Sequence, residues 1–193
     1  MAGTPRHGDR IMTTSIRTIR PNVSQNEALR KFSSPGLATL YRRIRVGPLR
    51  RIAGVYVPFF LYRVRYELGR TPQTRFFAMD AVDGSLDLFE FPGLPSEAQL
   101  VQVETRNYLR PALSGKRAEE LLGDKVLRII FQQGFFKLRE SNLACIRERI
   151  DLHLPYWLAF YGDTTARCRV MDATRRRIEG AKASAFFEQW LAA

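Results

Sequence analysis

An internal repeat is the feature that most constrains the fold of this 193-residue chain. Residues 150–158, with the sequence IDLHLPYWL, align with residues 53–61, AGVYVPFFL, at an offset of 97. Residues 167–173 align with residues 75–81 at an offset of 92, and both segments end in Met-Asp-Ala. The difference of five residues falls in the intervening loop, where insertions are tolerated. Two matches in the same order predict two related halves that share one core.

Both halves alternate apolar and polar residues, which is typical of β-strands. The alternation covers 49–57, 60–68 and 144–154, and Pro58 marks a bend, a bulge or a sheet edge because proline donates no ladder hydrogen bond. Segments on either side of Asp83-Gly84 predict a tight hairpin. We therefore predict an α+β protein of two antiparallel, β-rich halves, each with a helix packed on one face.

Helices are predicted where a capping residue precedes apolar residues at helical spacing. Ser24 and Glu27 form a capping box, and Ser34-Pro35 starts a second helix. The expected helices cover about 24–32, 34–44, 116–133 and the residues after Ser184. The predicted division is a disordered basic tail over 1–23, a first half over 24–92 and a second half over 96–193.

The positive charge is concentrated near the start of the chain. Residues 1–51 hold eleven of the 31 Lys and Arg residues against two acidic residues. This basic arm predicts attraction to a polyanion such as nucleic acid. The alternative is a bias of composition, because 26 of the 31 basic residues are Arg. The candidate polyanion-binding residues are Arg30, Lys31, Arg42, Arg43, Arg45 and Arg50.

Two cysteines, Cys145 and Cys168, are too few for a disulfide scaffold or a four-cysteine zinc site. Cysteines without a disulfide partner are typical of a reducing compartment, so we predict a cytoplasmic protein. The alternative is organelle targeting in a eukaryote, because residues 1–20 are rich in Arg, Ser and Thr and poor in acidic residues. The longest apolar run, 53–62, is shorter than the ~20 residues of a membrane span. The chain has no glycine-rich phosphate loop and no cluster of metal ligands, so no cofactor or metal is expected.

Three acidic or basic residue sets could carry chemistry. Asp80 and Asp172 occupy equivalent repeat positions and could act as acid and base in one cleft, although an Asp before a turn more often caps backbone N–H groups. His153 lies on a polar strand face without the nucleophile that a catalytic triad needs. Arg51 and Glu148, also at equivalent positions, are hypothesised to form an ion pair between the halves. We expect no catalysis.

The aromatic pairs that follow the two strand prolines are the candidates for an apolar contact surface or ligand pocket, with core packing as the alternative. They are Phe59, Phe60, Tyr156 and Trp157. The sequence thus favours a non-catalytic binding or assembly module that acts through protein–protein contacts, as a homo-oligomer or within a complex. The alternative function is polyanion binding, with nucleic acid as the partner of residues 1–51.

Overall fold

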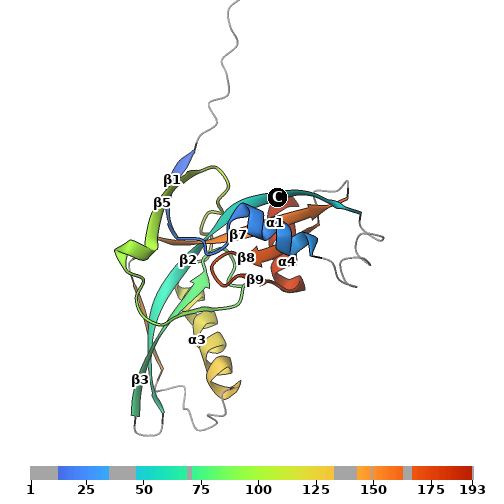
Figure 1. The fold of residues 1–193 in the computed structure, drawn as a ribbon. Coiled ribbons are helices and arrows are strands. Elements are labelled where there is room, and N and C mark those ends of the chain that lie inside the picture. Colours follow the sequence, from blue (N-terminus) through green and yellow to red (C-terminus); the bar gives the residue numbers. More distant parts are fainter. Residues whose placement is uncertain are drawn as a thin grey trace, which may run out of the picture.

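The computed structural model describes residues 13–34, 47–68, 71–132, 143–148, 150–162 and 167–192, which form an α+β fold around one mixed nine-stranded sheet. In chain order the elements are β1 (Thr14–Ile19), α1 (Gln25–Ser33), β2 (Leu49–Leu68), β3 (Thr71–Asp80), β4 (Phe89–Phe91), the 3₁₀ helix η1 (Glu97–Gln99), β5 (Leu100–Thr105), α3 (Gly115–Gln132), β6 (Ala144–Arg147), β7 (Leu152–Tyr161), β8 (Cys168–Asp172), β9 (Arg177–Ile178) and α4 (Ala181–Ala192) (Figure 1).

The long strand β2 organises the sheet, whose main path runs β4-β3-β2-β7-β1-β5. Strand β2 pairs with β7 along its first half and with β3 along its second half, both antiparallel. Strand β1 pairs with β7 in parallel. Tyr108 forms a second parallel bridge, with Tyr56 of β2. These parallel contacts correct the expectation of purely antiparallel halves. Their partners are far apart in the sequence, so alternation within a single strand cannot reveal them.

The two strand pairs whose sequences align, β2–β3 and β7–β8, have the same register. Phe59 of β2 is paired with Asp80 of β3, and Tyr156 of β7 is paired with Asp172 of β8. Where β2 meets β7, Val57 is paired with Leu154, its own counterpart at the offset of 97. The order β3-β2-β7-β8 therefore places one strand pair beside the other, with the two sequence segments running in opposite directions.

The capping box of α1 is confirmed. The N–H of Glu27 donates to Ser24 Oγ (3.3 Å), and the N–H of Ser24 donates to Glu27 Oε2 (2.8 Å). Helix α3 runs without a break through Gly123, and α4 begins three residues before Ser184. The helix expected over 34–44 falls outside the described residues.

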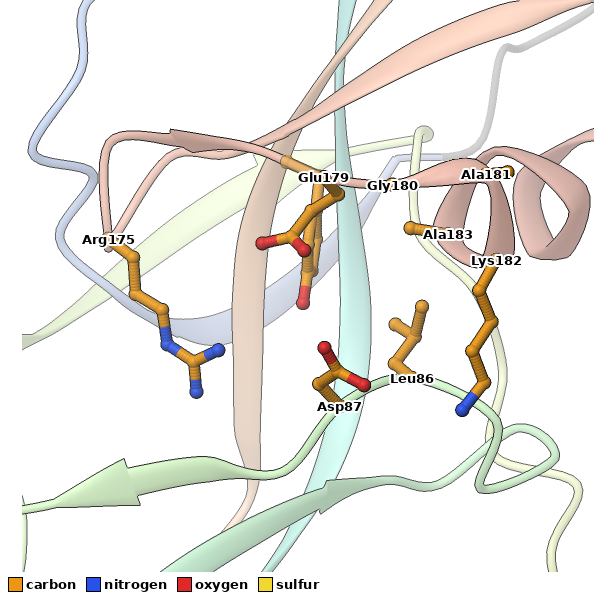
Figure 2. A pocket seen from close by; sticks show the side chains of 9 residues that line it. Leu86, Asp87, Arg175, Glu179, Gly180, Ala181, Lys182 and Ala183 are labelled. Carbon is orange, nitrogen blue, oxygen red and sulfur yellow. The ribbon is translucent and has the colours of Figure 1, made fainter.

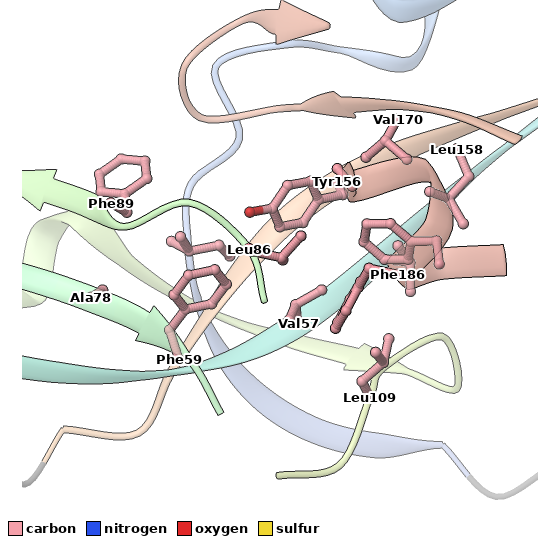
Figure 3. Packing of buried hydrophobic residues seen from close by; sticks show 14 of the residues in the cluster. Val57, Phe59, Ala78, Leu86, Phe89, Leu109, Tyr156, Leu158, Val170 and Phe186 are labelled. Atoms are coloured by element: carbon pink, nitrogen blue, oxygen red, sulfur yellow. The ribbon is translucent and has the colours of Figure 1, made fainter. Parts of the chain in front are cut away.

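Three apolar clusters hold the helices on the sheet. The largest lies between α4 and one face of the central strands, where Phe187 contacts Tyr156 (Figure 3). In the second cluster, α3 packs on β2 and β3 through Ala118, Leu122, Val126 and Ile130. Helix α1 packs against β7 and β8 through Ala28 and Phe32. Helix α1 thus covers strands of the second half and α3 covers strands of the first, whereas α4 packs on β8 of its own half.

Several local expectations differ from the structure. Residues 14–19, expected in the disordered tail, form β1 between β7 and β5, because their apolar side chains are buried there. The tight hairpin at Asp83-Gly84 is instead a longer loop, since Ala78 pairs with Phe89. The strand expected over 144–154 is divided into β6 and β7. Residues 1–12 lie outside the described residues.

The proposed pair of Arg51 and Glu148 is wrong. Glu148 forms an ion pair with Arg63 at 2.8 Å, and Arg51 lies over the ring of Phe160 at 5.0 Å. The reason is the antiparallel pairing of β2 with β7, which puts Phe160 beside Arg51, while the N–H of Glu148 donates to the carbonyl of Leu61.

Candidate functional site

Two adjoining hollows lie around residues 86–88, between α3, the β8–β9 turn and the start of α4. The larger, here called the basic recess, has a volume of about 410 Å³. Its charged wall residues are Lys125, Arg128, Arg175, Arg177, Lys182 and Asp87. The smaller, here called the inner cavity, has a volume of about 180 Å³ and shares Asp87, Arg175 and Lys182 with the recess.

A buried carboxylate shapes the loop on one side of the recess. Asp80 Oδ1 accepts N–H hydrogen bonds from Val82, Asp83 and Gly84 at 3.3, 3.1 and 2.9 Å, and Oδ2 accepts one from Leu86 at 2.8 Å. Gly84 has a φ of 73°, a conformation that glycine adopts without strain. The loop that carries Asp87 and Leu88 is therefore fixed by its own backbone.

Asp172 shapes the opposite turn in the same way. Its Oδ1 accepts N–H hydrogen bonds from Thr174 and Arg175, both at 2.8 Å, and Arg175 Nε lies 3.7 Å from Oδ2. Burial raises the pKa of both carboxyl groups, Asp80 and Asp172, and the backbone hydrogen bonds oppose that rise. The two carboxylates stand on β3 and β8 with β2 and β7 between them, so they do not share a cleft.

Arg175 and Arg177 are held by groups at the edge of the recess. Arg175 Nη2 donates to the carbonyl of Leu88 at 2.7 Å, and the guanidinium lies over the ring of Phe89 at 4.2 Å. Arg177 donates to both carboxylate oxygens of Glu179, at 3.1 and 2.9 Å, and lies 3.8 Å from Asp87. Both guanidinium groups are therefore fixed without a ligand, which lowers the entropy cost of binding one.

The other three cations come from two helices. Lys125 of α3 donates through Nζ to the carbonyl of Leu86, and burial lowers its pKa although Asp80 opposes that change. Arg128 of α3 and Lys182 of α4 are exposed, and neither has an ion-pair partner within the described parts of the chain. Once the internal ion pairs are counted, the recess keeps a surplus of positive charge.

The inner cavity has a polar floor and a helix end in its wall. Figure 2 shows Arg175 and Lys182 on opposite sides, with Asp87 and Glu179 between them. The first turn of α4 contributes residues 180–183. Tyr156, which is 5% exposed, also lines the cavity, and Figure 3 shows its hydroxyl pointing toward Leu86. Burial raises the pKa of Tyr156 well above its ordinary value, so the hydroxyl keeps its proton.

The four aromatic candidates do not form a common surface. Phe59 and Tyr156 are buried in the large core cluster. Phe60 is half-buried beneath Arg147, whose guanidinium lies 3.6 Å from the ring centre. Trp157 is half-buried beside α1 and donates Nε1 to the carbonyl of Val23 at 3.0 Å. Of the four, Tyr156 alone contributes to the inner cavity.

Of the six candidates for polyanion binding, three do not line the basic recess and three lie outside the described residues. Arg30 and Lys31 are exposed on α1, where Lys31 Nζ donates to the carbonyl of Arg176 at 2.6 Å. Arg50 is exposed on β2. Arg42, Arg43 and Arg45 lie outside the described residues. The recess cations were missed because three distant segments supply them; the run Arg175-Arg176-Arg177 was the available signal.

The remaining titratable candidates have structural contacts. His153 Nδ1 lies 3.2 Å from the carbonyl oxygen of Arg17, and burial lowers its pKa. Cys168 is buried, which raises the pKa of its thiol to about 12, and neither it nor Cys145 forms a disulfide. Within the described ranges, no group of three or more His, Cys, Asp or Glu side chains could hold a metal ion.

Helix length and hydropathy also bear on the environment of the chain. Among the helices of the described segments, none combines the length and the apolar composition required to cross a bilayer. No protein-family model, curated protein sequence or solved structure matches this chain.

Proposed function

We propose that this chain is a non-catalytic binding module that takes an anionic ligand in the basic recess. One observation carries this proposal: five cationic side chains from α3, the β8–β9 turn, β9 and α4 line one hollow of about 410 Å³. That volume is within the range of sites for small ligands, ~300–1,000 Å³. Lys125, Arg175 and Arg177 are already oriented by protein contacts, and exposed Arg128 and Lys182 add charge at the rim.

The proposal of ligand binding in the basic recess differs from both functions predicted from the sequence, protein–protein contact and polyanion binding through residues 1–51. Burial of Phe59 and Tyr156 removes half of the aromatic surface expected for protein–protein contacts. Assembly through other surfaces, a homo-oligomeric state and a cytoplasmic location stay predictions. Polyanion binding through residues 1–51 also stays a prediction, and it differs from the present proposal in the residues that it uses.

Paired charge variants test the proposal. We expect Arg128→Ala with Lys182→Ala to weaken binding of pyrophosphate to the full chain at least about tenfold, since a hydrogen bond to a charged group contributes about 1.5–3 kcal/mol. Isothermal titration calorimetry at several salt concentrations provides the measurement. The control is Lys116→Ala with Arg106→Ala, which removes two exposed cations that do not line the recess.

A second ligand separates the recess from the basic arm. Unchanged pyrophosphate affinity in the recess variant would overturn the proposal. If a single-stranded RNA of 20 nucleotides also binds, and Arg42→Ala, Arg43→Ala and Arg45→Ala together abolish that binding while the recess variant does not, the arm is the polyanion site.

We also propose that the two halves descend from one duplicated strand–helix–strand–strand unit. The matched registers of β2–β3 and β7–β8 support this origin. So do the two turns: the N–H of Ala81 donates to the carbonyl of Pro58, and that of Ala173 donates to the carbonyl of Pro155. Four residues after each aspartate the backbone has a positive φ, 73° at Gly84 and 60° at Arg176.

The elements before each strand pair support the same origin. Residues 19–24, Ile-Arg-Pro-Asn-Val-Ser, align with residues 109–114, Leu-Arg-Pro-Ala-Leu-Ser, at an offset of 90. Both serines precede a helix, and the carbonyls of Ser24 and Ser114 each accept an N–H hydrogen bond at 2.9 Å from an alanine four residues on. The two parallel bridges, Thr18 with His153 and Tyr108 with Tyr56, also join equivalent positions.

A further inference from the structure

We propose that the anionic ligand of the basic recess is a mononucleotide, with its phosphates in the recess and its base stacked on Phe131 in an adjoining groove. This inference rests on the proposed function, because the recess would hold the phosphates. Two observations carry it: a second hollow shares part of its wall with the recess, and that hollow contains an exposed aromatic ring.

The second hollow, here called the aromatic groove, lies along α3 and has a volume of about 580 Å³. Its described wall residues all belong to that helix, and they are Asp124, Leu127, Arg128, Phe131 and Gln132. Arg128 and Gln132 also line the basic recess. The two hollows therefore adjoin at these two side chains, and one ligand can occupy both.

Helix geometry places Phe131 on the side of α3 that faces away from the sheet. Phe131 follows Leu122 by nine residues, about two and a half helical turns, so the two side chains lie on opposite sides of the helix. Leu122 is fully buried, whereas Phe131 is 38% exposed. One exposed phenylalanine is common on protein surfaces. Here it stands three residues after Arg128, which is the spacing of neighbours on a helix surface, and so lies beside the recess.

The wall of the aromatic groove favours a nucleobase over an alkyl chain. Aromatic rings and arginine guanidinium groups both stack on bases, so Phe131 and Arg128 suit a planar ring. The Gln132 amide can donate and accept hydrogen bonds at the edge of a base. An alkyl chain would instead cover the polar groups of Asp124, Arg128 and Gln132 without giving them a hydrogen-bond partner, which is unfavourable.

The charge of the basic recess suits the phosphates of a nucleotide. Three carboxylates, Asp87, Asp172 and Glu179, offset three of the five described cations. Two positive charges then remain for a ligand. Proteins that bind a nucleic-acid strand use a groove that follows the backbone, whereas these cations line a single hollow. The arrangement therefore favours a mononucleotide over a strand.

One substitution separates the base from the phosphates, with the full chain as the protein and with ATP and inorganic tripolyphosphate as the probes. We expect Phe131→Ala to weaken ATP binding roughly tenfold, because it removes the ring on which the base stacks. Tripolyphosphate has no base, so its affinity should not change. Isothermal titration calorimetry measures both, and unchanged tripolyphosphate binding also shows that the recess of the variant is intact.

Two further variants are the controls. Phe131→Tyr keeps an aromatic ring and should retain the affinity for ATP. Leu191→Ala is matched in exposure, because Leu191 is also 38% exposed, but this residue of α4 lines neither hollow. It should leave ATP binding unchanged. Thermal unfolding reports the fold of each variant.

The outcomes separate this inference from the proposed function. If Arg128→Ala with Lys182→Ala weakens pyrophosphate binding, but Phe131→Ala weakens ATP binding no more than Leu191→Ala does, the recess stands and the nucleotide assignment is overturned. If neither pyrophosphate nor ATP binds, both proposals fail.

Two other ligands test the class of molecule. Tighter binding of n-decyl diphosphate than of ATP, lost in Phe131→Ala, would overturn the assignment of a base in the groove. Tighter binding of a single-stranded RNA of 20 nucleotides than of ATP, weakened by the same substitution, would overturn the choice of a mononucleotide over a strand.

Discussion

At the scale of single residues, Asp80 and Asp172 illustrate how one side chain can organise a functional wall. Each carboxylate accepts backbone N–H hydrogen bonds from the residues that follow it, and thereby fixes the loop or turn that carries recess residues. The two sites differ in one respect. Both oxygens of Asp80 accept backbone N–H hydrogen bonds, whereas Oδ2 of Asp172 faces the Arg175 guanidinium.

This difference predicts unequal costs for the same substitution. Asp80→Asn replaces one accepting oxygen with an NH₂ group and leaves a buried N–H unsatisfied, so we expect a loss of about 1–3 kcal/mol in the free energy of unfolding. Asp172→Asn can keep both backbone hydrogen bonds through its remaining oxygen and should cost less. Urea unfolding of both variants measures the costs. Equal costs would contradict the assigned hydrogen-bond pattern.

Residue patterns predicted the local roles but not the site. The Asp-then-turn pattern anticipated that each carboxylate binds backbone N–H groups, because such contacts lie within six residues. Local patterns could not predict the basic recess, because Lys125, Arg175 and Lys182 come together only when α3, the β8–β9 turn and α4 pack. The orientation of the Tyr156 hydroxyl depends on the same packing.

At the scale of elements, the sequence predicted strands and helices well where the signal is local. The Ser24–Glu27 capping box gave α1 within a residue or two, and alternation gave most of β2 but only the first three residues of β7. Strand β1 was missed because its charged and polar residues resemble those of a basic tail. Its place in the sheet comes from its long-range partners, β5 and β7.

The free energy of unfolding is expected to depend on pH through His153, which lies where β7 pairs with β1. Burial lowers its pKa below the ordinary 6.5, so the unfolded chain binds the proton more readily than the folded chain does. The free energy of unfolding should therefore decrease as the pH falls below about 6.5, because burial disfavours the charged imidazolium, while the hydrogen bond to the Arg17 carbonyl favours it and opposes the decrease.

His153→Gln provides the comparison, because glutamine is polar and has no charge to gain. We expect the difference in unfolding free energy between the wild-type chain and this variant to shrink or reverse from pH 7.5 to pH 5. Chemical unfolding at several pH values measures it. A constant difference over this range would mean that the pKa of His153 is the same in the folded and the unfolded chain, and would contradict the prediction.

At the scale of the whole molecule, two helices connect the halves, residues 24–92 and 96–193, because each helix packs on strands of the other half. Helix α1 covers β7 and β8, and α3 covers β2 and β3. This exchange of helices also builds the basic recess, because α3 brings Lys125 and Arg128 to a loop of the first half while Arg175 reaches it from the second. Neither half alone contains the whole site.

The exchange predicts that the halves cannot fold separately. In a fragment of residues 1–92, the β2–β3 surface that normally covers fully buried Leu122 and Val126 would be exposed to water; in a fragment of residues 96–193, the β7–β8 surface under Phe32 would be exposed. We expect neither fragment to unfold cooperatively, and an equimolar mixture to regain a cooperative transition.

A full chain with a protease site at residues 93–95, cleaved after folding, is the control for cutting the connection itself. Circular dichroism and size-exclusion chromatography give the measurement. A fragment that folds alone would contradict the exchange, because each half would then own a complete core.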